Sequence, residues 1–227
     1  MPEATALVMQ QDFPNHENRD YVTFRYGEAR LHAGDQEGAL KALDVLRQDL
    51  ALRLDTAPEW WPEVWLLLAE TYLNRKEYAN VEGTLNDLRQ RAPNTPVLYR
   101  GDLILAQRWV ITAEWEKART AYQQVLDNPV AQRTEAEAEA QFRIAETYLK
   151  QKNYADAFKA YYKVVVGPQF PEWQSHALYQ AGVCDKVQRN WEGAATSFRK
   201  LIEDFPESDS ARKAETQLEE IRPFLKP

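Results

Sequence analysis

The word AETYL occurs twice in this chain, at residues 69–73 and 145–149, and the similarity continues as AETYLNRKEYANV and AETYLKQKNYADA. Such repetition indicates that one structural unit is stacked on copies of itself, so it constrains the fold more than composition does. Aligning the small residue that opens the word with its equivalents gives five anchor positions, spaced by 37 to 42 residues: Gly27, Ala69, Ala106, Ala145 and Gly182.

Other columns repeat in step with the anchor. Small residues stand twelve positions later, at Ala39, Val81, Ala118, Ala157 and Ala194. Large apolar residues stand sixteen positions later, at Leu43, Leu85, Tyr122, Tyr161 and Phe198. Small residues let two helices approach closely, and large apolar residues at helical spacing fill the layer against the next repeat. The columns therefore predict two antiparallel helices in each repeat.

Capping residues and prolines fall between the predicted helices. Asp35, Asn153 and Asn190 can each cap the N-terminus of a second helix, and Ser208 can cap a final one. The repeats close at prolines, which cannot continue a helix interior: Pro93, Pro129, Pro168 and Pro206. Only 8 glycines are present, whereas sheet-rich folds need many glycine-containing turns. We expect an all-α protein.

The columns resemble the tetratricopeptide repeat, an array of helix–turn–helix units. The second repeat, residues 65–93, carries the family pattern most fully, with Trp65, Leu68, Ala69, Tyr72, Tyr78, Leu85, Leu88 and Pro93. The resemblance covers residues 19–206. It implies a right-handed α-solenoid of about five tetratricopeptide-like repeats in one continuous stack, closed by a C-terminal capping helix within residues 207–227, where most positions are polar.

Both ends of the chain suggest a wider context. The segment KLIEDFPESDSARKAETQLEEI resembles the C-terminal end of tetratricopeptide domains in bacterial envelope proteins, such as the Tol-Pal coordinator and the outer-membrane assembly lipoprotein. That resemblance favours a periplasmic or envelope location over a cytoplasmic one. The triplet DFP closes a repeat at 204–206 and also occurs at 12–14. We therefore expect residues 1–18 to be the remnant of a preceding repeat, with a helix at 4–12; the alternative is a natural start.

Several function classes are disfavoured by composition. A net charge of −7 and a pI near 5.2 oppose general nucleic-acid binding. No apolar run reaches the ~20 residues that span a bilayer. The three histidines, His16, His32 and His176, lie in separate repeats, and Cys184 is the single cysteine, so we expect no metal site. No phosphate loop or catalytic triad is legible, so we expect no cofactor and no catalytic residues.

The tryptophans fit structural columns better than a ligand-stacking platform. Trp60 and Trp173 each belong to a PEW triplet nine positions before an anchor. We expect each to dock its helix onto the preceding repeat. Trp61 has no structural column.

In the family that the columns resemble, the first helix of each repeat lines a concave groove. The matching positions predict an apolar and aromatic strip edged by acids, made of Phe24, Arg25, Glu28, Leu66, Glu70, Leu103, Gln107, Phe142, Arg143, Glu146 and Tyr179. A protein segment would lie along it, with basic side chains reaching Glu70 and Glu146. Alternatively, Arg25–Glu28 and Arg143–Glu146 merely pair along their own helices. Chaperone-binding relatives clamp a C-terminal carboxylate with Lys and Asn, which these columns lack.

The resulting hypothesis is a non-enzymatic scaffold that binds an extended or helical segment of a partner protein. Two alternatives remain open at this point. The chain is a purely structural solenoid segment of a larger multidomain protein, or it is an accessory domain of an enzyme whose catalytic part lies elsewhere.

Overall fold

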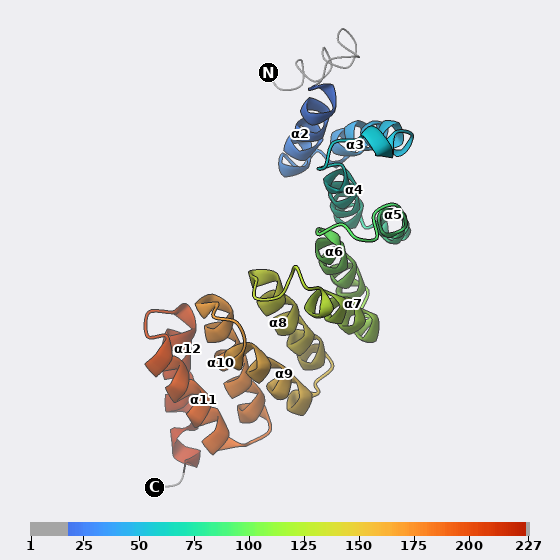
Figure 1. Ribbon diagram of the computed structural model, residues 1–227. Helices are drawn as coiled ribbons and strands as arrows, with labels where there is room; N and C mark the ends of the chain where they lie inside the picture. Colours follow the sequence, from blue (N-terminus) through green and yellow to red (C-terminus); the bar gives the residue numbers. More distant parts are fainter. Residues whose placement is uncertain (1–17, 226–227) are drawn as a thin grey trace. The chain divides into compact units, whose positions relative to one another are not determined.

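The computed structural model describes residues 18–225. The helix expected at 4–12 lies outside this range. The described residues form eleven α-helices and no strand (Figure 1). The first helices of the repeats are α2 (Arg19–His32), α4 (Pro62–Asn74), α6 (Leu98–Ile111), α8 (Glu135–Lys150) and α10 (Pro171–Val187). The second helices are α3 (Gln36–Ala51), α5 (Tyr78–Arg91), α7 (Trp115–Asp127), α9 (Tyr154–Val166) and α11 (Trp191–Asp204), and α12 (Asp209–Ile221) follows them.

The helices pack in chain order, as a stack of helix–turn–helix repeats requires. Helix α2 packs on α3, α3 on α4 and α4 on α5; later, each helix from α7 to α11 packs on the next helix along the chain. The predicted fold class, an all-α solenoid of helix–turn–helix repeats, is confirmed.

Close packing at the anchor explains why it is small. A Cβ atom added to Gly27 would lie 2.6 Å from Cγ of Leu43, and one added to Gly182 would collide with the Phe198 ring. Leu43 and Phe198 are fully buried and stand sixteen positions after their anchors. The anchor of a first helix therefore faces the large apolar column of its own second helix, which confirms the predicted antiparallel pair.

Each repeat turns between its two helices through one left-handed residue, seven positions after the anchor. These residues are Gly34 (φ 80°), Lys76 (φ 61°), Ala113 (φ 58°), Lys152 (φ 59°) and Arg189 (φ 60°). Four of the five carry a side chain in a conformation that favours glycine, so the sequence does not reveal the column.

The predicted caps follow these turns. Asp35 accepts a hydrogen bond from the Gly38 amide at 2.9 Å, and Asn153 and Asn190 accept from amides three residues on, each at 3.3 Å. Ser208 likewise accepts from the Ala211 amide at 3.1 Å. All four predicted caps are confirmed, because each side chain bonds an amide that the first turn of a helix leaves unpaired.

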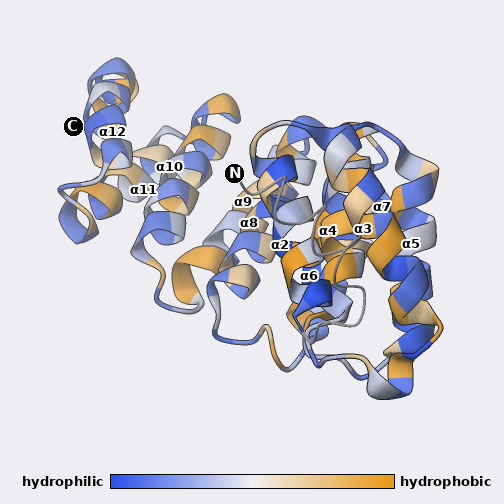
Figure 2. Cartoon of the chain, turned by 90° about the horizontal axis from the view of Figure 1, so that it is seen from above, coloured by the Kyte–Doolittle hydropathy of each residue, from blue (hydrophilic) through white to orange (hydrophobic). Residues whose placement is uncertain are grey.

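The chain divides into two compact units, here called the N-terminal unit (residues up to Arg108) and the C-terminal unit (from Trp109). The N-terminal core surrounds Trp65, Leu43 and Leu85. The C-terminal core includes Phe198 and the buried face of α12. In Figure 2 helix α4 is mostly apolar, whereas α12 is largely polar with few apolar residues. Helix α12 therefore covers the last apolar face, as predicted for a capping helix.

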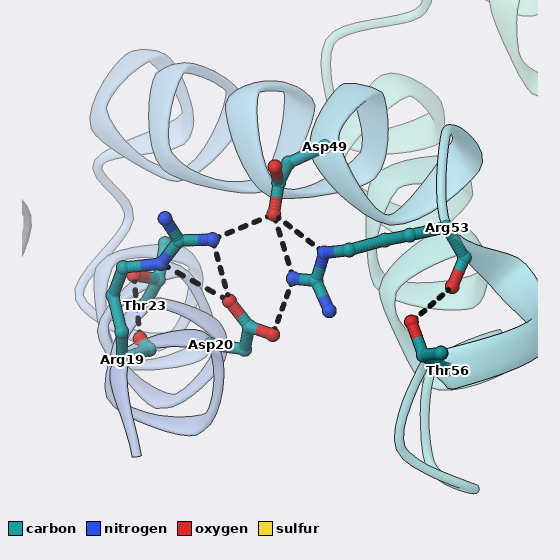
Figure 3. A network of polar contacts seen from close by, with 6 residues as sticks. All are labelled: Arg19, Asp20, Thr23, Asp49, Arg53 and Thr56. Atoms are coloured by element: carbon teal, nitrogen blue, oxygen red, sulfur yellow. Dashed lines mark hydrogen bonds and ion pairs between the residues drawn. The ribbon is translucent and has the colours of Figure 1, made fainter. Parts of the chain in front are cut away.

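A network of two arginines and two aspartates fixes the first helix pair of the N-terminal unit (Figure 3). Arg19 of α2 binds Asp49 of α3 at 2.6 Å, and Arg53, just after α3, binds Asp20 of α2 at 2.5 Å and Asp49 at 2.6 Å. Partial burial opposes ionisation of Asp49, but the hydrogen bond and charge of Arg53, aided by Arg19, hold its pKa below the ordinary value.

Candidate functional site

The predicted site residues of the N-terminal unit lie on α2, α4 and α6, and several of them have partners within the unit. The Phe24 ring packs on the Trp60 ring, with centroids 5.2 Å apart. Leu66 is only 1% exposed and belongs to the core. Arg25 and Glu28 form an ion pair at 2.6 Å, so the predicted alternative of pairing along one helix is realised. Leu103 and Gln107 are half-buried and exposed respectively.

The first helices of a unit form one of its faces, here called the first-helix face. In the N-terminal unit an ion pair between two side chains of the unit occupies this face. Nη1 of Arg100 on α6 lies 2.6 Å and 2.7 Å from the two carboxylate oxygens of Glu63 on α4. Glu70 stands nearby, and burial raises its pKa, with the carboxylates of Glu63 and Glu28 adding to the shift and Arg100 opposing it.

The first-helix face of the C-terminal unit is open instead. A pocket of about 410 Å³ lies among α8, α10 and α12. It brings together four predicted residues, Phe142, Arg143, Glu146 and Tyr179. Sequence reasoning did not assign the other residues that line it to a site: Glu172, Trp173, His176, Gln180, Ser210 and Lys213.

Aromatic rings form one side of the pocket. Phe142 is 6% exposed, and its ring centroid lies 5.2 Å from that of Tyr161, 5.3 Å from that of Trp173 and 6.4 Å from that of His176. The indole N–H of Trp173 donates to Glu135 of α8 at 3.1 Å. Trp173 thus docks α10 onto α8, as the Trp60–Phe24 contact docks the start of α4 onto α2. The predicted docking role of both tryptophans is confirmed.

The charged side chains of the pocket divide into paired and unpaired groups. Arg143 binds Glu146 at 2.8 Å and Glu139 at 3.4 Å, and it lies over the Trp173 ring at 5.7 Å. Lys213 of α12 is exposed and forms no ion pair with any residue in the range 18–225. Lys213 is the cation left free for a ligand at this pocket.

A second hollow lies on the second-helix side of the C-terminal unit. It has a volume of about 560 Å³ and is lined mainly by polar residues of α7, α8 and α9. Its buried Arg119 is already satisfied by Thr147 at 2.9 Å and Gln151 at 2.7 Å, and it stacks over Tyr148 at 4.2 Å. Since this arginine is held within the fold, it is not free to bind a ligand in the hollow.

The remaining features concern the single cysteine, the potential metal ligands, the apolar helices and Trp61. Burial, with the nearby charge of Asp185, raises the pKa of the Cys184 thiol to about 12, which leaves it protonated and unreactive. Across residues 18–225, no three His, Cys, Asp or Glu side chains gather as metal ligands. No helix in the described part of the chain is both long and apolar enough to cross a bilayer. Trp61, which had no column, packs edge-on against Trp65 at 4.8 Å.

Comparisons with known proteins agree with this architecture. Tetratricopeptide repeat family models match residues 112–172 and 176–208, in the C-terminal unit, although the fullest pattern was expected in residues 65–93. No curated protein matches. Residues 112–172 and 176–208 therefore match tetratricopeptide repeats, which generally mediate protein–protein interaction and are typically non-catalytic.

Solved structures match most of the chain at low identity. A putative kinesin light chain of Podosopora anserina with nearly identical TPR-like repeats is 13% identical, with a TM-score of 0.65 over 89% of this chain and 98% of that one. Apo RapI is 14% identical, with a TM-score of 0.64 over 88% and 81%. MamA is 19% identical, with a TM-score of 0.58 over 78% and 92%. Identities this low show the fold alone.

Proposed function

We propose that this protein is a non-enzymatic scaffold whose C-terminal unit binds an extended or helical segment of a partner protein in the pocket among α8, α10 and α12. The observation that carries the proposal is the pocket itself. It combines an aromatic side with unpaired polar groups, a composition common at protein interfaces. Four of the residues predicted from the sequence line it.

The burial of individual residues divides their roles. Phe142 is almost covered by Tyr161, Trp173 and His176, so it supports the pocket rather than supplying contact area. Trp173 and Tyr179 are half-buried and remain accessible to a ligand. Because a few aromatic anchors usually dominate an interface, these two side chains would supply most of the affinity.

The N-terminal unit is proposed to contribute less to binding. Its predicted residues Arg25 and Glu28 pair with each other, and Leu66 is buried. Glu70, Leu103 and Gln107 remain candidates for weaker contacts along the first helices.

The cellular setting is proposed to be a bacterial envelope assembly, in the periplasm. The support is the resemblance of residues 200–221 to the ends of envelope tetratricopeptide domains. Affinity capture from separated periplasmic and cytoplasmic fractions tests this location: partners that depend on the pocket should come from the periplasm.

A library of random linear peptides displayed on phage, selected on the full chain, tests the binding function. Selected peptides should bind the wild type and lose binding to Gln180→Trp, which places a large side chain in the pocket. Gln123→Trp is the matched control, because it makes the same change on the exposed second-helix face. Failure to select any peptide, or equal binding to Gln180→Trp, would refute the proposal and favour a purely structural solenoid.

A further inference from the structure

Each unit has a cationic residue, and a second residue one repeat earlier, at equivalent positions of the repeat. Arg100 stands seven residues after the repeat-closing Pro93, and Lys213 stands seven residues after Pro206. Glu63 stands six residues before the anchor Ala69, and His176 stands six before the anchor Gly182. The pair Glu63 and Arg100 in the N-terminal unit therefore corresponds to the pair His176 and Lys213 in the C-terminal unit.

In the N-terminal unit, the cation of this pair binds a carboxylate. Arg100 contacts both oxygens of Glu63, at 2.6 Å and 2.7 Å, so a carboxylate from α4 lies against the cation on α6. Ionised partners make this contact shorter and stronger than a neutral hydrogen bond. The carboxylate is supplied from within the chain.

The C-terminal unit lacks that carboxylate. His176 takes the place of Glu63, and its ring turns toward the aromatic side of the pocket, 6.4 Å from the Phe142 ring centre. Lys213 and His176 both line the open pocket, and Lys213 has no ion-pair partner within residues 18–225.

We propose that the pocket binds an Asp or Glu side chain within the partner segment, paired with Lys213, while an adjacent apolar side chain packs against Trp173 and Tyr179. The partner would supply from outside the carboxylate that Glu63 supplies in the N-terminal unit. This inference rests on the proposed binding function and adds the chemistry of the partner.

The remaining charges of the pocket limit how acidic the segment can be. Glu146 is already paired with Arg143, whereas Glu172 is exposed and forms no ion pair within the described residues. A second acidic residue in the segment would approach Glu172 and be repelled, so a single acid beside an apolar residue fits best.

The expected effect is moderate. Exposed ion pairs contribute little, and loss of this one should weaken binding by roughly two- to fivefold at low salt. The loss should shrink as ionic strength rises, because salt screens exposed charges.

The test uses peptides selected from the random library and measures their affinity by fluorescence anisotropy. Each peptide is compared with its Glu→Gln or Asp→Asn counterpart, on the wild type and on two variants of exposed residues. Lys213→Met removes the cation, and His176→Glu supplies a carboxylate from within the chain, as Glu63 does. Lys150→Met is the matched control, since Lys150 is an exposed lysine of α8 that does not line the pocket.

We expect selected peptides to carry an acid beside an apolar residue, and the acid-to-amide change to weaken binding to the wild type. The same change should make no difference on Lys213→Met, and His176→Glu should bind the acidic peptides more weakly. Equal binding of acid and amide peptides would overturn this inference while the binding function stands. Binding that requires a free peptide C-terminus would also overturn it, and failure to select any peptide would overturn both proposals.

Discussion

The two units are built on the same repeat and differ in what completes the first-helix face. In the N-terminal unit Glu63 and Arg100 pair across α4 and α6, and the network of Arg19, Asp20, Asp49 and Arg53 ties α2 to α3. In the C-terminal unit, α12 brings Lys213, which has no ion-pair partner in the described part of the chain, to a pocket where His176 stands in the position of Glu63. The comparison points to the proposed binding site: it lies in the unit where the cation has no carboxylate partner among the described residues.

The largest effect is expected from substitutions in the cores of the two units, and it tests whether these cores are separate. Trp65 and Phe198 are fully buried, one in each unit. Replacing either with Ala should cost about 3–5 kcal/mol of unfolding free energy, because transfer and cavity terms add. Hydrogen exchange should show protection lost mainly in α3–α5 for Trp65→Ala and mainly in α10–α12 for Phe198→Ala. The same pattern of loss in both variants would contradict the assignment of two cores.

The next effect tests the close helix contact at the C-terminal anchor. A Cβ on Gly182 would collide with the buried Phe198 ring, so Gly182→Ala should cost about 1–3 kcal/mol through overpacking. Gly83 on α5 is the control, since a Cβ there meets nothing within 4 Å and should stabilise the helix by about 0.5–1 kcal/mol. Urea denaturation measures both, and equal effects would mean that the anchor contact is not tight.

A smaller effect concerns the half-buried acid of the N-terminal face. Burial raises the pKa of Glu70, so its ionised form disfavours the folded state. That penalty is full above the raised pKa and disappears as the pH falls below the pKa of the unfolded chain. Glu70→Gln should therefore be more stable than the wild type at neutral pH, by up to about 1 kcal/mol, and equal to it in acid. Lower stability of the variant at neutral pH would show that Glu70 has a favourable partner.

The smallest effect concerns the network of Figure 3. Partial burial raises the pKa of Asp49, but Arg53 and Arg19 outweigh this effect and lower the pKa overall. The stabilisation is present above the pKa of the unfolded chain and is lost as the pH falls through the folded pKa. Asp49 is partly exposed and screened, so Asp49→Asn should cost about 0.2–1 kcal/mol at neutral pH and nothing in strong acid. Thermal melts at both pH values measure this, and a cost independent of pH would rule out the charge as its cause.

The sequence was sufficient for the parts of the fold that repeat visibly. The residue type indicates the structural role at buried columns such as Ala157 and Phe198. The same holds at helix N-caps such as Asp35 and Asn190. The left-handed turns could not be read, because Lys76 and Ala113 are not types that mark that conformation.

The candidate site was only partly predictable for a different reason. Leu66 and Phe142 stand in a column that borders both groove and core, and only packing shows that both are buried. Lys213 was missed because it lies beyond the last anchor, in the capping helix. Counting from Pro206, as Arg100 is counted from Pro93, would have drawn attention to it.

The proposal that a partner segment binds in the pocket among α8, α10 and α12 is tested most directly by locating a bound peptide on the chain. A peptide selected on the full chain is given a spin label at one end, and the line broadening of backbone amide signals is measured by NMR. We expect the strongest broadening around the pocket on α8, α10 and α12, with weak or no broadening of the α2 and α4 signals. Broadening confined to the first helices of the N-terminal unit, or to the second-helix face of α7 and α9, would contradict it.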